Sequence, residues 1–212
     1  MIGDKSLLML SPHTDDGELA AGGTMARFID EDWDVYYVAF SSCEKSIPRG
    51  DPEDILKTEC KKATEILGIP RANLFLLDYE VRSFPSERQD ILDKMIEIEK
   101  EIKPHLVFVP SSNDTHQDHQ TIFWEALRAF KKASSIWGFE NPWNNLNFTT
   151  DIFVRLEKEH IERKIRALKE YHSQDSKSYF KDDYIMASAR MRGTQVDYRF
   201  AETFELLRML VG

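Results

Sequence analysis

The alternation of short apolar runs with longer amphipathic stretches constrains the fold of this chain most strongly. Four runs have the length and composition of buried strands: residues 6–11, 35–40, 73–77 and 106–110. The segments between consecutive runs contain stretches with helical periodicity. Strands that are separated by helices require crossover connections, so the sequence predicts an α/β fold with a mainly parallel sheet.

Local signals place helices between these strands. A helix is expected around residues 23–31. Asp51 and Pro52 supply an N-cap and a first-turn proline for a second helix, which Gly68 ends. Ser86 caps a third helix, whose apolar residues fall on one broad face. Each helix can therefore cover the sheet with one side.

The last third of the chain gives a weaker pattern. Residues 138–147 indicate a loop, residues 151–156 a strand and residues 160–171 a helix, whereas residues 201–211 fit either a helix or a strand. No linker-like tract, change of composition or internal repeat divides the sequence. Because 212 residues are enough to bury one large core, we expect a single domain over residues 1–212.

Charge and composition exclude several classes of partner. The chain carries 28 Lys+Arg against 37 Asp+Glu, a formal charge of −9, with no basic cluster that would attract nucleic acid. No apolar run reaches the roughly 18 residues of a membrane span, and the first residues lack a signal-peptide core. Cys43 and Cys60 form neither a disulfide framework nor a CxxC pair. We expect a soluble, cytoplasmic protein that binds neither nucleic acid nor membranes.

Two polar segments directly follow the first and fourth predicted strands. The first is SPHTDDGE, residues 11–18, and the second is NDTHQDH, residues 113–119. In the doubly wound, Rossmann-like strand order 3-2-1-4-5, strands one and four are neighbours, and the chain reverses direction between them. Ligands bind in the crevice at that point of a three-layer sandwich. The two segments are therefore expected to face each other across one site.

The residue types in these segments point to a metal site. Three of the six histidines and several carboxylates converge there, and this ligand set suits zinc or iron(II). A zinc ion can lower the pKa of bound water to about 7. Of the adjacent Asp15 and Asp16, one would bind the metal while the other accepts a proton as general base. Alone, either motif is compatible with a helix cap or turn, but their joint placement favours the metal site.

At these two positions, SPHTDDGELAAGGT and HQDH resemble the LmbE-like N-acetylglucosaminyl-phosphatidylinositol deacetylase (PIG-L) family. Weaker similarity continues through AFSS, KKATEILGI, YHSQ and AETF. Members remove acetyl groups from amino sugars, including intermediates of mycothiol and bacillithiol synthesis. The resemblance implies a metal-dependent N-deacetylase, a hydrolase of linear amide C–N bonds, that acts on a small N-acetylated amino sugar or its conjugate. Many members form oligomers, and on the basis of this resemblance we expect a homo-oligomer.

The resemblance also assigns roles to matching positions. Asp15 would be the general base, His116 would stabilise the oxyanion, and Asp118 would orient His116. Zn²⁺, with Fe²⁺ as the alternative, would be held by His13, Asp16 and His119.

Two departures from the common HPDDE motif stand out. Thr14 replaces the proline, and its hydroxyl is expected to hold the loop. Gly17 displaces the acidic residue to Glu18, whose role the resemblance leaves open.

Residues that contact the substrate are only weakly marked in the sequence. Arg49, Arg192 and His172 are candidates for binding it, although an exposed loop arginine is more often simply solvated and His172 is equally compatible with a structural position. His105 and His160 are expected to be structural and surface residues, respectively. Aromatic side chains near the second motif either wall a sugar pocket or belong to the core: Trp124, Trp137, Phe139 and Trp143.

Two other functions stay open at this point. A metal-dependent phosphatase would use a similar ligand set but needs more ligands and a basic clamp. A non-catalytic metal- or sugar-binding module needs no general base, which Asp15 would provide. A nicotinamide dehydrogenase is suggested by the parallel sheet alone, because residues 21–23 do not form GxGxxG.

Overall fold

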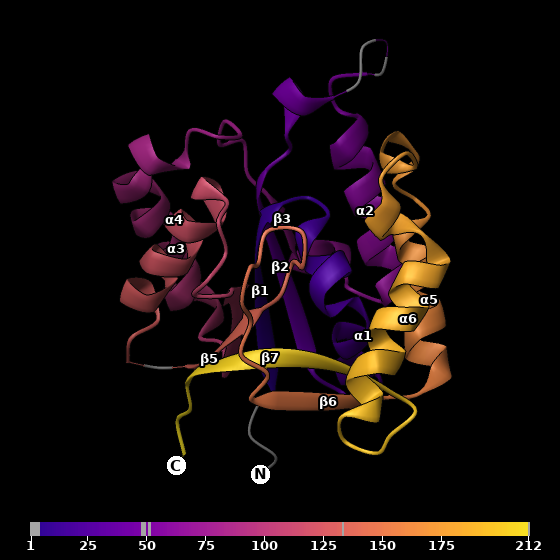
Figure 1. The fold of residues 1–212 in the computed structure, drawn as a ribbon. Coiled ribbons are helices and arrows are strands. Elements are labelled where there is room, and N and C mark those ends of the chain that lie inside the picture. Colours follow the sequence, from indigo (N-terminus) through magenta and orange to yellow (C-terminus); the bar gives the residue numbers. More distant parts are fainter. Residues whose placement is uncertain (1–4, 48–49, 51, 133, 212) are drawn as a thin grey trace.

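A seven-stranded sheet forms the centre of the molecule, with strand order β3-β2-β1-β4-β5-β7-β6 (Figure 1). The computed structural model describes residues 5–47, 50, 52–132 and 134–211. The strands are β1 (Ser6–His13), β2 (Asp34–Ser41), β3 (Leu74–Leu76), β4 (Leu106–Pro110), β5 (Ser135–Phe139), β6 (Ile152–Leu156) and β7 (Phe200–Arg208). The predicted order 3-2-1-4 is confirmed for the first four strands, which pair in parallel, and β5, a strand that was not predicted, pairs in parallel with β4. β7 and β6 extend the sheet with antiparallel pairing.

Helices cover both faces of the sheet and make the three layers of the predicted sandwich (Figure 1). The described helices are α1 (Asp16–Asp30), α2 (Ile55–Leu67), α3 (Arg88–Ile102), α4 (Gln117–Ala129), α5 (Lys158–Leu168) and α6 (Asp182–Thr194). In Figure 1, α3 and α4 lie on one side, and α1, α2, α5 and α6 on the other. Each side buries its own apolar cluster. β1 is buried along its whole length because it lies at the middle of the sheet.

Three predicted helix starts were wrong. α1 begins at Asp16 rather than near Gly23, because the polar residues after β1 already belong to its first turn. α2 begins at Ile55 after Asp54, so Pro52 precedes the helix, and the predicted cap Asp51 lies outside the described residues. Ser86 ends a short 3-10 turn, and α3 begins after Glu87. The end of α2 at Gly68 is confirmed.

The last third of the chain differs most from the prediction. The loop expected over residues 138–147 begins two residues later, because Gly138 and Phe139 are the end of β5. A Cβ at Gly138 would lie 3.2 Å from the Cα of Ser111, so glycine here permits close packing of neighbouring strands rather than a turn. The ambiguous segment 201–211 forms most of β7, and α6 was not predicted. None of the described helices is long and apolar enough to cross a membrane.

Candidate metal centre

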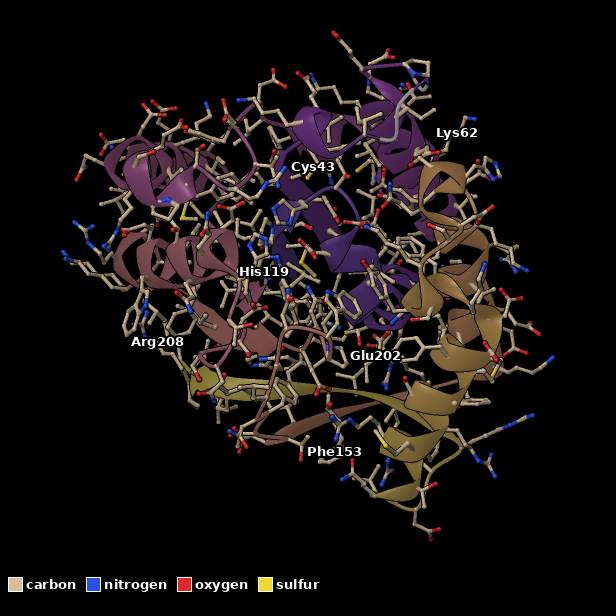
Figure 2. All side chains as sticks on the ribbon, turned by 45° about the horizontal axis from the view of Figure 1, so that its top comes forward. Cys43, Lys62, His119, Phe153, Glu202 and Arg208 are labelled. Atoms are coloured by element: carbon tan, nitrogen blue, oxygen red, sulfur yellow. The ribbon has the colours of Figure 1, made fainter. Side chains whose placement is uncertain are left out.

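The two polar segments meet at the carboxyl ends of β1 and β4, as predicted. His13 is the last residue of β1, and Asp16 is the first residue of α1. His116 caps the N-terminus of α4, and His119 lies in its first turn. His119 is labelled in Figure 2, where it lies in the middle of the molecule between the two helical layers. Short connections after adjacent strands therefore place residues about 100 positions apart in contact.

Three side-chain atoms from these segments form a small triangle. Asp16 Oδ2 lies 2.9 Å from His13 Nδ1 and 3.1 Å from His119 Nε2. The two imidazole nitrogens are 3.3 Å apart. Ligand atoms that are each about 2.0–2.1 Å from a tetrahedral zinc ion stand roughly 3.3 Å from one another. The three donors thus have the spacing of ligands around one small cation. A ring nitrogen of His116 also lies within 4.8 Å of those of His13 and His119.

Two further carboxylates hold the imidazoles in position. His13 Nε2 lies 3.1 Å from Asp118 Oδ2, and His119 Nδ1 lies 2.8 Å from Asp114 Oδ2. When these nitrogens carry the protons, the lone pairs of the other two nitrogens point into the triangle. Carboxylate partners of this kind are typical of metal-binding histidines. Asn141 completes the arrangement, because its Nδ2 donates to Asp16 Oδ1 over 2.9 Å.

The pKa values in the triangle favour an anionic Asp16 carboxylate next to positive charge. Burial raises the pKa of Asp16, but the nearby imidazoles of His119 and His13 outweigh this effect and hold the pKa well below its usual value. Burial lowers the pKa of His119, whereas the Asp16 and Asp114 carboxylates raise it to about 10 overall. Asp16 therefore remains an anion although it is buried, as a metal ligand must.

Asp15 and His116 lie beside the triangle and line the same cavity. The pKa of Asp15 is raised by burial and by the neighbouring charge of Asp16, an environment that favours proton uptake. His116 Nδ1 accepts a hydrogen bond of 3.2 Å from the backbone N–H of Asp118. Burial, together with His119 and His13, lowers the pKa of His116. The neutral His116 ring therefore carries its proton on Nε2.

The cavity above these residues has a volume of about 450 Å³, which is within the range of small-molecule sites. Cys43, which is labelled in Figure 2, lines it together with Leu56 and Val81. Another wall carries the rings of Trp143 and Tyr179, which stack with their centroids 3.9 Å apart.

Another buried carboxyl group, that of Glu18, lies in the first turn of α1 together with Asp16. Its oxygens accept hydrogen bonds from the hydroxyls of Tyr37 and Tyr171, and both hydroxyls also contact the carbonyl oxygen of Thr14. Burial raises the pKa of Glu18 to about 8. The expectation that the Thr14 hydroxyl holds the loop was wrong: this hydroxyl is buried without a hydrogen-bond partner among the described residues, and the tyrosines hold the Thr14 carbonyl instead.

The structure separates the predicted site residues into two groups. Five of them share the cavity: His13, Asp15, Asp16, His116 and His119. Asp118 is adjacent, but its carboxylate contacts His13 and the backbone N–H groups of Arg82 and Phe84. The expected orienting contact runs from the Asp118 backbone rather than from its side chain.

The candidate substrate residues lie elsewhere. His172 is exposed and does not line the cavity. Arg192 lies on α6, where it pairs with Glu140 at 2.6 Å and lines a different cavity. Arg49 lies outside the described residues. Of the aromatic candidates, Trp143 lines the cavity, Phe139 is in the core and Trp124 is exposed.

Sequence reasoning missed two polar residues that support the triangle. Asp114 lies inside the second polar segment, so its position alone could have indicated a role. Asn141 follows β5, a strand that was not predicted, and no sequence signal connects it to Asp16. His105 hydrogen-bonds Ser6 at the start of β4, in line with its predicted structural role.

Comparison with known proteins places these features in a family. The model of the PIG-L family, described as GlcNAc-PI de-N-acetylase, matches residues 8–130. The chain is 27% identical to the uncharacterized deacetylase YaiS of Escherichia coli, over 80% of this chain and 91% of that protein. It is 23% identical to the diacetylchitobiose deacetylase of Thermococcus kodakarensis, over 93% and 81%.

Solved structures show the same fold. The crystal structure of GalB, the 4-carboxy-2-hydroxymuconate hydratase of Pseudomonas putida, has a TM-score of 0.80, with 20% identity and 98% coverage of both chains. Because GalB is a hydratase, proteins with this fold can catalyse different reactions, and the fold alone does not determine the reaction.

Proposed function

The chain belongs to the PIG-L family of GlcNAc-PI de-N-acetylases, and we propose that it is a metal-dependent hydrolase that removes the acetyl group from a small N-acetylated amino sugar or its conjugate. One observation carries this proposal. The Asp16, His13 and His119 donors stand 2.9–3.3 Å apart on the floor of a cavity. Such spacing suits one metal ion that remains open to a substrate on the cavity side.

His13, Asp16 and His119 would hold the metal, and Asp114 and Asp118 would position the two imidazoles. Zinc suits this set of two nitrogens and one carboxylate oxygen, and iron(II) is the alternative. When bound, such an ion would polarise the acetamide carbonyl and make a water molecule more acidic.

The remaining residues would handle the protons and the developing charge. Asp15 would accept a proton from water as the water oxygen attacks the acetyl carbon. The Nε2–H of His116 would donate to the carbonyl oxygen as it gains negative charge. The C–N bond then breaks while the nitrogen takes up the proton from Asp15. The products are acetate and a free amino sugar.

Acetate release tests this function. The purified protein is treated with a chelator, reloaded with Zn²⁺ or Fe²⁺, and incubated with N-acetylglucosamine and its glycosides. We expect acetate and free amine in equal amounts from the reloaded protein and none from the chelated protein. Metal binding without acetate release from any of these compounds would contradict the proposed reaction.

Two further measurements address the alternatives. A phosphatase would release phosphate from p-nitrophenyl phosphate, and a binding module would retain sugar without turnover. Asp15, placed in the cavity beside the triangle, supports catalysis over binding alone. The cytoplasmic location, the extent of the domain over residues 1–212 and a homo-oligomeric state stay predictions.

A further inference from the structure

One wall of the cavity is built by the segment that connects α5 to α6. Tyr171 and Phe180 are buried at its two ends. Ser173 is held in between, because its backbone N–H and its hydroxyl both donate to the Glu59 carboxylate of α2, over 2.9 and 2.6 Å. This wall is therefore fixed at three points rather than being an unattached loop. Lys177 lies on it and lines the cavity.

Lys177 is the sole lysine or arginine among the described residues that line this cavity. Other cations of the same region have carboxylate partners: Lys169 pairs with Asp182 and Lys164 with Glu202, each at 2.6 Å. Lys177 has no such ion pair within the described part of the chain. Its ammonium is half-buried, contacts Tyr179, and lies 5.6 Å from the centre of that ring. Burial lowers the pKa of Lys177, but the Asp15 carboxylate and Tyr179 raise it overall, so the ammonium stays charged inside the cavity.

The ring that Lys177 contacts belongs to the stacked pair of Trp143 and Tyr179. This pair gives the cavity a flat apolar face next to a positive charge. Apolar side chains of Leu19, Leu56 and Val81 also line the cavity, and Asp15 and the triangle of donors line it as well. A substrate that places its acetamide on the floor can lay a sugar ring against the aromatic face. Any group that extends past the ring toward Lys177 meets the positive charge of its ammonium.

We propose that Lys177 and the Trp143–Tyr179 pair form a subsite that selects N-acetylated amino sugars bearing an anionic group, a carboxylate or a phosphate. The inference rests on the proposed deacetylase function and narrows its substrate class. The attraction of an anion to a partly desolvated ammonium supplies binding energy that a neutral glycoside does not receive.

The experiment must distinguish this role of Lys177 from an effect on the general base. Its charge also acts on the Asp15 carboxylate, so a lysine that served only the general base would help all substrates alike. A subsite for anions instead helps only the acidic ones, and it acts on KM rather than on kcat.

The test compares three substrates of one scaffold: methyl N-acetylglucosaminide, its carboxymethyl counterpart and N-acetylglucosamine 1-phosphate. We expect the wild-type protein to prefer an acidic substrate, and the better of the two identifies the anion. Lys177→Met should raise KM for the acidic substrates about tenfold, which corresponds to the loss of one charge-assisted contact. With the methyl glycoside KM should rise much less, so that the preference for acidic substrates is lost, and Lys177→Arg should retain the preference.

Lys181→Met is the matched control. Lys181 belongs to the same segment and its ammonium binds the carbonyl oxygen of Asp175, but it does not line the cavity. Removing its charge should change neither the KM values nor the preference. An equal loss of kcat with all three substrates in Lys177→Met would overturn the subsite, as would a wild-type protein without preference for acidic substrates.

A binding measurement keeps the inference separate from the proposed reaction. Calorimetric titration with glucosamine 1-phosphate and methyl glucosaminide should show tighter binding of the phosphate to wild-type protein and to Lys181→Met, and no difference in Lys177→Met. If no substrate releases acetate but this binding preference is found, the reaction is wrong and the subsite stands. If acetate is released but the preference is missing, the reaction stands and the subsite is wrong.

Discussion

Asp16 and Glu18 are both buried, lie two residues apart in the first turn of α1, and have opposite charge preferences. Asp16 faces two imidazoles and an amide N–H, and its pKa is held well below the usual value despite burial. Glu18 faces two tyrosine hydroxyls, and burial raises its pKa to about 8. Burial is common to both, so the partners decide which carboxyl is an anion.

The two carboxyl groups therefore have different roles, one on each side of the first turn of α1. The Asp16 side presents negative charge and nitrogen lone pairs to the cavity, where a cation can bind. The Glu18 side holds the Thr14 carbonyl through Tyr37 and Tyr171, and thereby fixes the backbone that carries His13, Asp15 and Asp16. One side provides chemistry and the other provides rigidity.

On the Asp16 side, substitutions should separate metal binding from proton transfer. Asp15→Asn is expected to lower kcat by about 10²- to 10⁴-fold, the range for loss of a general base, while the protein keeps its metal. His13→Ala should lose the metal together with the activity. Elemental analysis and acetate release on both variants check this, and an equal loss of metal in both would contradict the division of roles.

His116 should affect turnover without affecting the metal. His116→Ala is expected to lower kcat about 10²- to 10³-fold, as for the loss of one oxyanion donor, with metal content unchanged. Because Nδ1 of the ring already accepts from the Asp118 backbone, the proposed donor is the neutral Nε2–H, and His116→Gln should recover part of the rate. A variant that loses metal would instead identify His116 as a ligand.

Gly17 lies between Asp16 and Glu18, and its replacement should disturb the contacts of Glu18 before those of Asp16. A Cβ at this position would lie 2.7 Å from both Cε2 and the hydroxyl oxygen of Tyr37 and 2.9 Å from Met9 Cγ. Gly17→Ala should therefore displace Tyr37 from Glu18 and lower the free energy of unfolding by about 1–3 kcal/mol, as overpacking does. Urea denaturation measures it. Unchanged stability would show that Tyr37 is free to move.

Glu18 should also make the stability of the protein depend on pH. The unfolded chain releases this proton near its usual pKa of 4.5, whereas the folded protein retains it up to about pH 8. Between these values the folded state binds more protons, so this group makes stability fall as pH rises from about 4.5 to about 8. Glu18→Gln removes that contribution. The difference in urea midpoint between wild type and Glu18→Gln should change between pH 5 and pH 8; a constant difference would contradict the raised pKa.

The comparison also explains what the sequence could predict. β1, β2 and β4 are buried runs of apolar residues, and their order follows from crossover rules, so the position of the two polar segments at one edge was predictable. β5 and α6 were not, because β5 contains a glycine and partly buried residues, and α6 has a weakly amphipathic sequence.

The same limit applies to the site. His13 and His119 follow strands that the pattern identifies, so their meeting was predictable. Asn141 reaches Asp16 across 125 residues from a connection after β5, and Lys177 lies between two helices at a position that no local signal marks. The partners of Glu18 are likewise two tyrosines from distant elements, Tyr37 and Tyr171, which is why its role stayed open until the fold was known.

The most direct test of the central claim is the metal content of two variants, Asp16→Asn and Glu18→Gln, beside the wild type. Each is purified, reloaded with Zn²⁺, dialysed and measured by elemental analysis. The account predicts about one ion per chain in wild type and Glu18→Gln, and a large loss in Asp16→Asn, which keeps the shape of the side chain but not its charge. If both variants keep the ion, or if both lose it equally while still folded, the two carboxylates do not have the separate roles assigned to them.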